Sequence, residues 1–319
     1  MQVPLLKWHT LKCVVALILV GGSITPAVAR QAIEIAQPLL TAQAQPNSQT
    51  AADLVNQGLQ LIQQGKIQEA IAAFQKATQL DAKLAPAHYN LGLAFRQSGQ
   101  LQPAANAFYQ ATQADPKFAL AYANLGAALL EGNNSQQAED YLKRALEIDK
   151  KLGLAHYNLG LLQEQQRDWE RAIASYKKAM KYSPMPEPVY HLGLIYLQQD
   201  KVDRATDTFH KALKINPNYP EAHYSLGSIL FSKGKLAEAL EAFRKSAQSN
   251  SNYANAYYGA GLVFMKLRQY ADAQQVLQSA KDLYTAQGNT QWATNTDQLL
   301  QQVRKGELSV GDPPNPPIN

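Results

Sequence analysis

A period of about 34 residues runs through the chain from Ala51, and it limits the possible folds more than any other feature. Every repeat has glycine at its eighth position, alanine at its twentieth and a large apolar side chain at its twenty-fourth. Seven repeats begin at Ala51, Ala85, Ala119, Gly153, Pro186, Pro220 and Ala254. This pattern predicts a stack of one repeated supersecondary element, because no single repeat can bury its apolar face alone.

Each repeat is predicted to form two helices joined by a tight turn. Apolar residues at positions 7 and 11, and then at 20, 24 and 27, recur at helical spacing on two separate stretches. Glycine at position 15 suits a left-handed turn between the helices, as in Gly65, Gly99 and Gly234. Proline at position 32 ends the second helix, as in Pro116, Pro184 and Pro217.

The small residues at positions 8 and 20 predict a close approach of the two antiparallel helices. A larger residue there would overpack the contact, whereas the large residue at position 24 fills the space between neighbouring repeats. The predicted fold class is therefore all-α, an α-solenoid.

The anchors resemble the tetratricopeptide repeat (TPR): Leu-Gly at positions 7 and 8, Ala at 20, an aromatic residue at 24, Ala at 27 and Pro at 32. The resemblance extends from Ala51 to about Gln287. It implies a right-handed superhelix whose first helices line a concave groove, and a scaffold that holds an extended peptide or a partner helix there. The seven expected repeats are 51–84, 85–118, 119–152, 153–185, 186–219, 220–253 and 254–287, followed by a capping helix over 288–305.

The segments outside the repeats have other roles. Residues 1–29 are predicted to be a signal peptide, because Lys7 and Lys12 precede an apolar stretch that ends in the small residues Ala27-Val28-Ala29. Residues 30–50 form a Gln/Pro-rich linker, and 306–319 are expected to be a disordered tail. If this signal is cleaved, we expect the protein to be exported to a bacterial periplasm or cell envelope. If the N-terminal helix is retained, we expect it to anchor the chain to a membrane.

Composition argues against several functions. Cys13 is the only cysteine, so the cleaved chain would have no disulfide and no thiolate site. The net charge of +5 is not concentrated in a basic stripe, which argues against nucleic-acid binding. The sequence shows no phosphate-binding loop, nucleophile elbow or metal-ligand pair, so we expect no catalytic residue, no cofactor and no metal: the chain is predicted not to be an enzyme.

Position 6 of the first helix offers candidate ligand-binding residues: Asn56, Asn90, Asn124 and Asn158, followed by His191, Ser225 and Gly259. The asparagines resemble the asparagine ladder in the repeat arm of the O-linked N-acetylglucosamine transferases. An amide both donates and accepts hydrogen bonds, so such a column can hold a peptide backbone without reading its side chains. The alternative is that asparagine is simply common at this position in the repeat family.

Position 5 offers tyrosines for the same groove: Tyr89, Tyr157, Tyr190, Tyr224 and Tyr258. Tyrosine is enriched at interfaces, so these rings are candidates for the groove wall together with His191. The alternative is packing against the adjacent helix, and the sequence does not choose between the two.

Position 2 argues against one form of peptide recognition. It reads Ala52, Pro86, Leu120, Leu154, Glu187, Glu221 and Asn255, without a basic residue. The subfamily that clamps C-terminal carboxylates uses lysine at this position, so a strongly acidic peptide is not the expected ligand.

The leading hypothesis is a non-catalytic scaffold for a protein or peptide partner. Two alternatives stay open: a targeting or regulatory subunit acting in trans for a glycosyltransferase or polysaccharide-export complex, and a membrane-anchored assembly factor. The sequence leaves the oligomeric state open.

Overall fold

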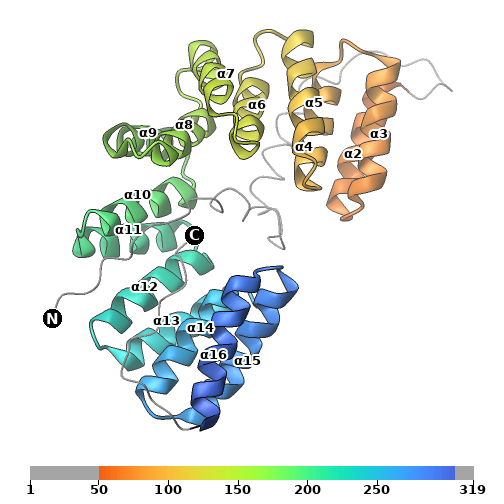
Figure 1. The fold of residues 1–319 in the computed structure, drawn as a ribbon. Coiled ribbons are helices and arrows are strands. Elements are labelled where there is room, and N and C mark those ends of the chain that lie inside the picture. Colours follow the sequence, from red (N-terminus) through yellow and green to blue (C-terminus); the bar gives the residue numbers. More distant parts are fainter. Residues whose placement is uncertain (1–49, 306–319) are drawn as a thin grey trace. The chain divides into compact units, whose positions relative to one another are not determined.

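The computed structural model describes residues 50–305, which form fifteen α-helices and no strand (Figure 1). The first helices of the repeats, here called the A helices, are α2 Ala51–Gln63, α4 Ala85–Gln97, α6 Ala119–Glu131, α8 Gly153–Gln165, α10 Pro186–Gln198, α12 Pro220–Ser232 and α14 Ala254–Lys266. The second, or B, helices are α3 Ile67–Leu80, α5 Leu101–Ala114, α7 Ser135–Ile148, α9 Trp169–Tyr182, α11 Val202–Ile215, α13 Leu236–Ser249 and α15 Tyr270–Ala286. A final helix, α16, spans Thr290–Lys305.

The all-α solenoid predicted from the sequence is confirmed. Every A helix starts at the residue where the corresponding repeat was expected to begin. The predicted signal peptide over 1–29, the linker up to residue 49 and the tail over 306–319 lie outside the described residues. The described part starts at Thr50, whose side chain caps α2 in a reciprocal capping box with Asp53.

The chain divides into two compact units, with the boundary between Ser183 and Pro184. The N-terminal unit contains α2 to α9 and the C-terminal unit contains α10 to α16. In both units each A helix packs against the B helix of its own repeat, and each B helix packs against the A helix that follows within the unit. Some A helices also touch directly: α2 contacts α4, α6 contacts α8, and α12 contacts α14.

The glycine at position 8 is required by the large position-24 side chain of its own repeat, an aromatic ring in five repeats and leucine in two. A Cβ added to Gly160 would lie 2.5 Å from Cε1 of Tyr176, far closer than carbon atoms pack. In the six later repeats the nearest atom of the position-24 side chain would lie at 2.5–2.7 Å from the added Cβ. The position-24 side chains are at most 2% exposed in all seven repeats, so they are core residues.

The turn between the A and B helices is left-handed at position 15 in every repeat. Gly65, Gly99 and Gly234 have φ between +72° and +75°, as predicted from their position. The other four repeats adopt the same conformation without glycine, at Asn133, Arg167, Asp200 and Arg268, with φ between +57° and +62°. Packing of the flanking helices therefore fixes the turn even where the residue type disfavours it.

The loop after the B helix has its own local signal. Five B helices end at an Asp or Asn whose side-chain oxygen accepts the backbone N–H two residues later, at 2.8–3.0 Å: Asp81, Asp115, Asp149, Asn216 and Asn250. These Asx turns stop the helix and direct the chain into the next repeat.

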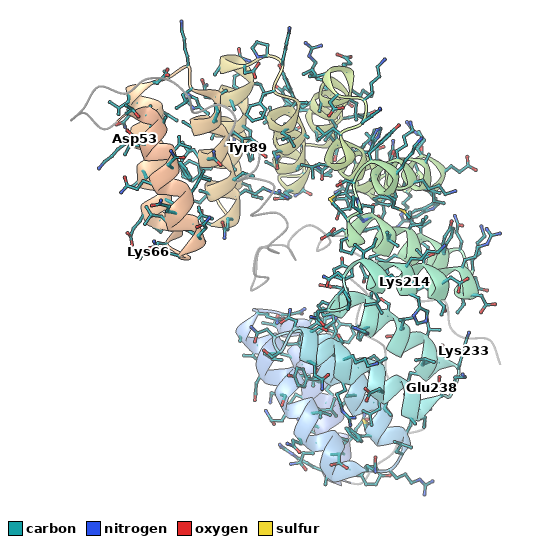
Figure 2. The ribbon with its side chains drawn as sticks, turned by 180° about the vertical axis from the view of Figure 1, so that it is seen from behind. Asp53, Lys66, Tyr89, Lys214, Lys233 and Glu238 are labelled. Carbon is teal, nitrogen blue, oxygen red and sulfur yellow. The ribbon has the colours of Figure 1, made fainter. Side chains whose placement is uncertain are left out.

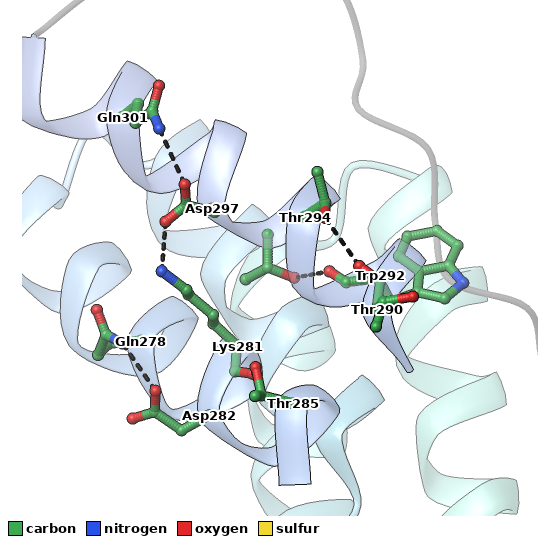
Figure 3. Close-up of polar contacts among 10 residues, drawn as sticks. Gln278, Lys281, Asp282, Thr285, Thr290, Trp292, Thr294, Asp297 and Gln301 are labelled. Carbon is green, nitrogen blue, oxygen red and sulfur yellow. Dashed lines mark hydrogen bonds and ion pairs between the residues drawn. The ribbon is translucent and has the colours of Figure 1, made fainter. Parts of the chain in front are cut away.

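Helix α16 packs against α15 at the C-terminal end of the described residues, and Figure 3 shows polar contacts within and between these two helices. Leu299, Leu300 and Val303 are buried against α15 and the preceding repeat. The indole of Trp292 packs edge-on against Tyr258, with ring centroids 5.5 Å apart. At the surface, Lys281 Nζ lies 2.5 Å from Asp297 Oδ1 and links α15 to α16.

No helix between residues 50 and 305 is both long and apolar enough to cross a lipid bilayer.

Candidate functional site

The candidate site is the face of the A helices that carries positions 2, 6, 9 and 13, here called the A face. These positions follow one another at helical spacing, so their side chains share one side of each helix. Direct contact sets these faces side by side for three pairs of neighbouring A helices: α2 with α4, α6 with α8, and α12 with α14. The residues at position 2 are partly exposed, and those at position 6 are buried in every repeat except the first.

Three of the four predicted asparagines are nearly covered. Asn90, Asn124 and Asn158 are 4%, 3% and 4% exposed, whereas Asn56 in the first repeat is exposed. The Nδ2 of Asn90 donates to Pro86 O at 2.8 Å, and that of Asn124 donates to Leu120 O at 3.0 Å. The side-chain N–H groups of these asparagines therefore already donate hydrogen bonds within the protein.

Two of the asparagines also tie neighbouring repeats together. Asn124 Nδ2 donates to the hydroxyl of Tyr89 in the previous repeat at 3.2 Å. Asn158 Nδ2 donates to Ala123 O, also one repeat earlier, at 3.3 Å. Because their Nδ2 groups are already used, these asparagines would contact a ligand mainly through their side-chain amide oxygens. Peptide binding by this asparagine ladder remains a prediction.

The position-5 tyrosines lie inside the stack. Tyr190, Tyr224 and Tyr258 are at most 2% exposed, and Tyr89 and Tyr157 are 8% and 7% exposed. Figure 2 shows Tyr89 among the packed helices, while charged residues such as Lys66 and Lys233 project outward. A groove wall needs exposed rings, so this burial favours packing, the alternative role that the sequence left open.

Each of these tyrosines packs against the position-24 ring of its own repeat where that ring is aromatic. The ring centroids of Tyr89 and Phe108 are 5.8 Å apart, and those of Tyr224 and Phe243 are 5.5 Å apart. Burial raises the pKa of the Tyr89 hydroxyl to about 12. The tyrosines are therefore neutral aromatic core residues, and their hydroxyls act as local hydrogen-bonding groups.

His191 continues the position-6 column in the C-terminal unit and is 8% exposed. Its ring meets Tyr190 edge-on, with centroids 5.8 Å apart. The structure therefore places His191 beside one of the predicted tyrosines, with little surface of its own.

An ion pair joins two A helices of the N-terminal unit. Arg96, at position 12 of α4, donates from Nε to Glu131 Oε1, at position 13 of α6, at 2.9 Å, and its Nη2 contacts the same oxygen. The glutamate side chain is only 5% exposed. Sequence reasoning missed this pair because the two residues are 35 positions apart and share no motif.

Position 2 changes character in the C-terminal unit, and sequence reasoning used this only to argue against a lysine clamp. Glu187 and Glu221 occupy position 2 of α10 and α12, and both are partly buried. Burial, with a smaller contribution from the nearby Glu187, raises the pKa of the Glu221 carboxyl to about 7. Two acidic residues one repeat apart were visible in the sequence, but their shared burial was not.

A metal centre finds no support in residues 50–305, since no three His, Cys, Asp or Glu side chains there come together in a way that could hold an ion. A surface hollow lies between the end of α11 and helices α12 and α13, beside Leu213 and Lys245. His223 borders it, and its Nε2 lies 2.8 Å from Pro217 O. That hydrogen bond gives the histidine a structural role in the loop.

Paired antiparallel helices, a left-handed turn at one fixed position and a glycine beside each core ring define a helical-repeat solenoid. The chain belongs to the tetratricopeptide-repeat family. Residues 35–226 match the family described as "Tetratricopeptide repeat protein 21 C-terminal ARM domain", and residues 227–267 match "TPR repeat". No curated protein sequence matches the chain.

Solved structures share the fold. The chain is similar to the APC/C hetero-tetramer Cut9-Hcn1, with a TM-score of 0.61 and 20% identity over 74% of this chain and 46% of that one. A thermophilic TPR protein of Thermus thermophilus gives 0.51 and 22% identity, over 57% of this chain and 100% of that one. Pseudomonas aeruginosa pilF gives 0.56 and 23% identity, over 63% of this chain and 92% of that one. The chain thus spans less than half of the first of these structures.

Proposed function

We propose that the protein is a non-catalytic scaffold that holds an extended segment of a partner protein along the A face. The supporting observation is that every repeat presents the same A-helix positions, and that three pairs of A helices (α2 with α4, α6 with α8, and α12 with α14) touch directly. An extended peptide is also periodic, so several weak contacts, each worth about 1 kcal/mol, can add along it. Membership of the tetratricopeptide-repeat family supports the same role.

In the N-terminal unit the A face combines a polar column with apolar flanks. Pro86, Leu120 and Leu154 at position 2 are partly exposed and stand one helical turn before the asparagines. Partly exposed leucines also stand at position 9, in Leu93 and Leu161. We infer that this unit holds a peptide whose backbone meets the amide oxygens and whose apolar side chains rest between the helices.

The test is a crosslinking pull-down with the full chain as bait, beside a variant in which Asn90, Asn124 and Asn158 are replaced by serine. Serine is the matched change, because Ser225 occupies position 6 of α12 and donates from Oγ to Glu221 O at 2.8 Å. The variant therefore keeps a hydrogen bond to the helix while losing the amide oxygen. A control variant carries Asn→Ser at the exposed Asn106, Asn218 and Asn252, away from the A face.

A partner retained by the wild type and the control but lost by the A-face variant would support the ladder. A partner retained equally by all three would remove the asparagines from the site and leave the scaffold role standing. Absence of any specific partner would overturn the scaffold role itself. A captured glycosyltransferase or polysaccharide-export component would instead support a targeting subunit acting in trans.

We also propose that residues 1–29 are a cleaved signal and that the protein acts in the cell envelope, because a positive start precedes an apolar run and an Ala-Val-Ala site. Mass spectrometry of the protein from its native host tests this. A mature chain that starts near Arg30 supports export, whereas a retained Met1 supports the membrane-anchored alternative.

A further inference from the structure

Two carboxylates stand at position 2 of successive A helices in the C-terminal unit. Glu187 on α10 and Glu221 on α12 are both partly buried, and the charge of Glu187 makes ionisation of Glu221 more costly. Burial is the main cause that raises the pKa of both carboxyls. Like charges are rarely placed together in a partly dry site without a partner that offsets them.

One carboxylate oxygen of this pair lacks a hydrogen bond. Glu221 Oε2 is buried and has no hydrogen-bond partner among the described residues. The rest of the Glu221 side chain still reaches the surface, and the terminal torsion of a glutamate rotates over a broad range. A small rotation therefore brings this acceptor to an incoming donor.

The hydroxyl of Tyr253 is the second polar group at this place without a partner. Tyr253 precedes α14 and is 5% exposed, and its Oη has no hydrogen-bond partner within residues 50–305. Burial is the main cause that raises the pKa of this hydroxyl, the charge of Glu221 raises it further, and the side chain of Asn255 beside it lowers it. Its neighbour Asn255 already accepts a hydrogen bond, from Tyr284 Oη at 2.6 Å.

The charged groups on the surrounding helices do not neutralise the negative charge of Glu187 and Glu221. His191, at position 6 of α10, acts on both carboxyls and lowers their pKa values, but less than burial raises them. The remaining titratable neighbours are tyrosines, Tyr190 and Tyr224, which stay neutral because they are buried. With both carboxyls ionised, the single positive charge that one histidine can carry does not neutralise the pair.

We propose that Glu187, Glu221 and the hydroxyl of Tyr253 form a subsite for the cationic side chain, arginine or lysine, of the partner segment held on the A face. This inference rests on the proposed scaffold function and names the chemistry of the partner. A guanidinium or ammonium group brings several N–H donors, which satisfy the free carboxylate oxygen and the hydroxyl together. Its charge offsets the two carboxylates.

A bare metal ion fits the subsite less well. Calcium takes six to eight oxygen ligands, and magnesium demands near-octahedral geometry. The cluster offers two carboxyls and a phenol, and it is not among groupings that could hold a metal in the described part of the chain. An N–H cation needs fewer acceptors and tolerates their uneven spacing.

The two units differ in the residues that they carry at position 2, and only the C-terminal unit has carboxylates there. The equivalent position-2 residues of the N-terminal unit include Pro86, Leu120 and Leu154, without any carboxylate. The arginine or lysine of a partner segment is therefore recognised by the C-terminal unit alone.

The test is an NMR titration of the full chain at pH 7.5 with three blocked nonapeptides of Gly and Ser that differ at the central residue. The central residues are arginine, lysine and citrulline, the last a neutral mimic of arginine. We expect one or both cationic peptides to shift the backbone amides around Glu187 and Glu221, and citrulline to bind at least tenfold more weakly. Comparison of arginine with lysine then distinguishes the two sources of the cation.

Variants locate the binding. Glu221→Gln and Glu187→Gln each remove one charge without a large change of shape, and both are expected to weaken the cationic peptide at least tenfold. Glu238→Gln is the matched control, because Glu238 is exposed on α13 of the same unit and pairs with Lys235. It is expected to bind like the wild type.

The pH dependence gives a second readout. A cation competes with the proton on Glu221, so the affinity should fall as the pH drops from 8 to 6, by up to tenfold per unit below the carboxyl pKa of about 7. Glu221→Gln should remove most of this slope. The proposal is overturned if no peptide binds, if citrulline binds as well as arginine, or if Glu221→Gln binds like the wild type.

Failure here is distinct from failure of the scaffold role. A partner captured in the pull-down but unaffected by Glu221→Gln would overturn only the cationic subsite. Specific binding of the arginine peptide without any captured partner would leave the subsite standing and count against the scaffold.

Discussion

Arg96 and Glu131 pair across a repeat boundary, and the carboxylate is the more deeply buried partner, with 5% of its side chain exposed against 21% for the arginine. The second carboxylate oxygen of Glu131 has no hydrogen-bond partner in the described chain. The negative charge of Glu131 is therefore offset mainly by Arg96, whereas the charge of Arg96 is also solvated by water.

We expect Arg96→Met to destabilise the N-terminal unit by about 3 kcal/mol, because it leaves a buried charge without its partner. Glu131→Gln should cost less, since it removes that charge. Arg244→Met is the control: Arg244 and Glu241 pair on α13 with half or more of each side chain exposed, so the loss should be below about 1 kcal/mol. Urea unfolding followed by circular dichroism measures all three, and equal losses for Arg96→Met and Arg244→Met would contradict the asymmetry.

Gly160→Ala should destabilise the chain by about 1–3 kcal/mol, although alanine is the better helix former, because its Cβ overlaps the ring of Tyr176. Gly160→Ala combined with Tyr176→Leu should not recover the loss, since a Cβ added at the equivalent Gly126 would lie only 2.7 Å from Cγ of Leu142. Gly132→Ala serves as the control, because its Cβ would lie 3.4 Å from the nearest atom. Thermal denaturation distinguishes them; a neutral Gly160→Ala would show that the ring moves freely.

Arg167→Gly and Arg268→Gly should each stabilise the chain by roughly 0.5–1 kcal/mol, since relief of the left-handed strain exceeds the entropy that glycine adds to the unfolded chain. Asn133→Gly should gain less, because asparagine tolerates this conformation better than arginine. The midpoints of chemical unfolding test the order of the three variants. A loss of stability in the arginine variants would mean that their side chains contribute more than the turn costs.

Stability should depend on pH through Glu221. Its folded pKa of about 7 lies above the ordinary glutamate value, so the folded state binds the proton more tightly. The contribution of this group is therefore most favourable below about pH 4.5 and is lost as the pH rises through 7.

Glu221→Gln should accordingly be more stable than the wild type at pH 8, and the difference should shrink at pH 5. The comparison is made between the two proteins at each pH, because the buried His156 and the half-buried His223 have lowered pKa values and act in the opposite direction. Urea midpoints from pH 5 to 8 provide the measurement. A difference that does not change with pH would mean that Glu221 is ionised in the folded state throughout this range.

The sequence predicted the fold in detail because its strongest signals are local. Glycine at position 8 and the ring at position 24 lie in the same repeat, so their contact recurs at one spacing and can be read directly. The left-handed turns at Arg167 and Arg268 could not be read in this way. There the packing of the two helices overrides the preference of the residue.

The site could not be predicted as well from the sequence, because the exposure of each A-helix side chain depends on its contacts with neighbouring repeats. The amide of Asn158 reaches Ala123 of the preceding repeat, and the ring of Tyr224 is buried against Phe243 and Tyr253. Neither burial nor the free oxygen of Glu221 has a sequence signature. Position alone identified the A face, whereas the exposure of its residues required the structure.

The position-8 glycine and the large position-24 side chain that it faces belong to one repeat, and this also bears on how such a chain can change in length. A duplicated or deleted repeat contains both the position-8 glycine and the position-24 side chain that packs on it. The hydrogen bond from Asn158 to Ala123 ends on a backbone carbonyl, which any residue at that position supplies. Arg96 and Glu131 are different, because each needs a specific residue in the adjoining repeat. Gain or loss of whole repeats is therefore least disruptive away from this junction, where the ion pair determines which two repeats can stand next to each other.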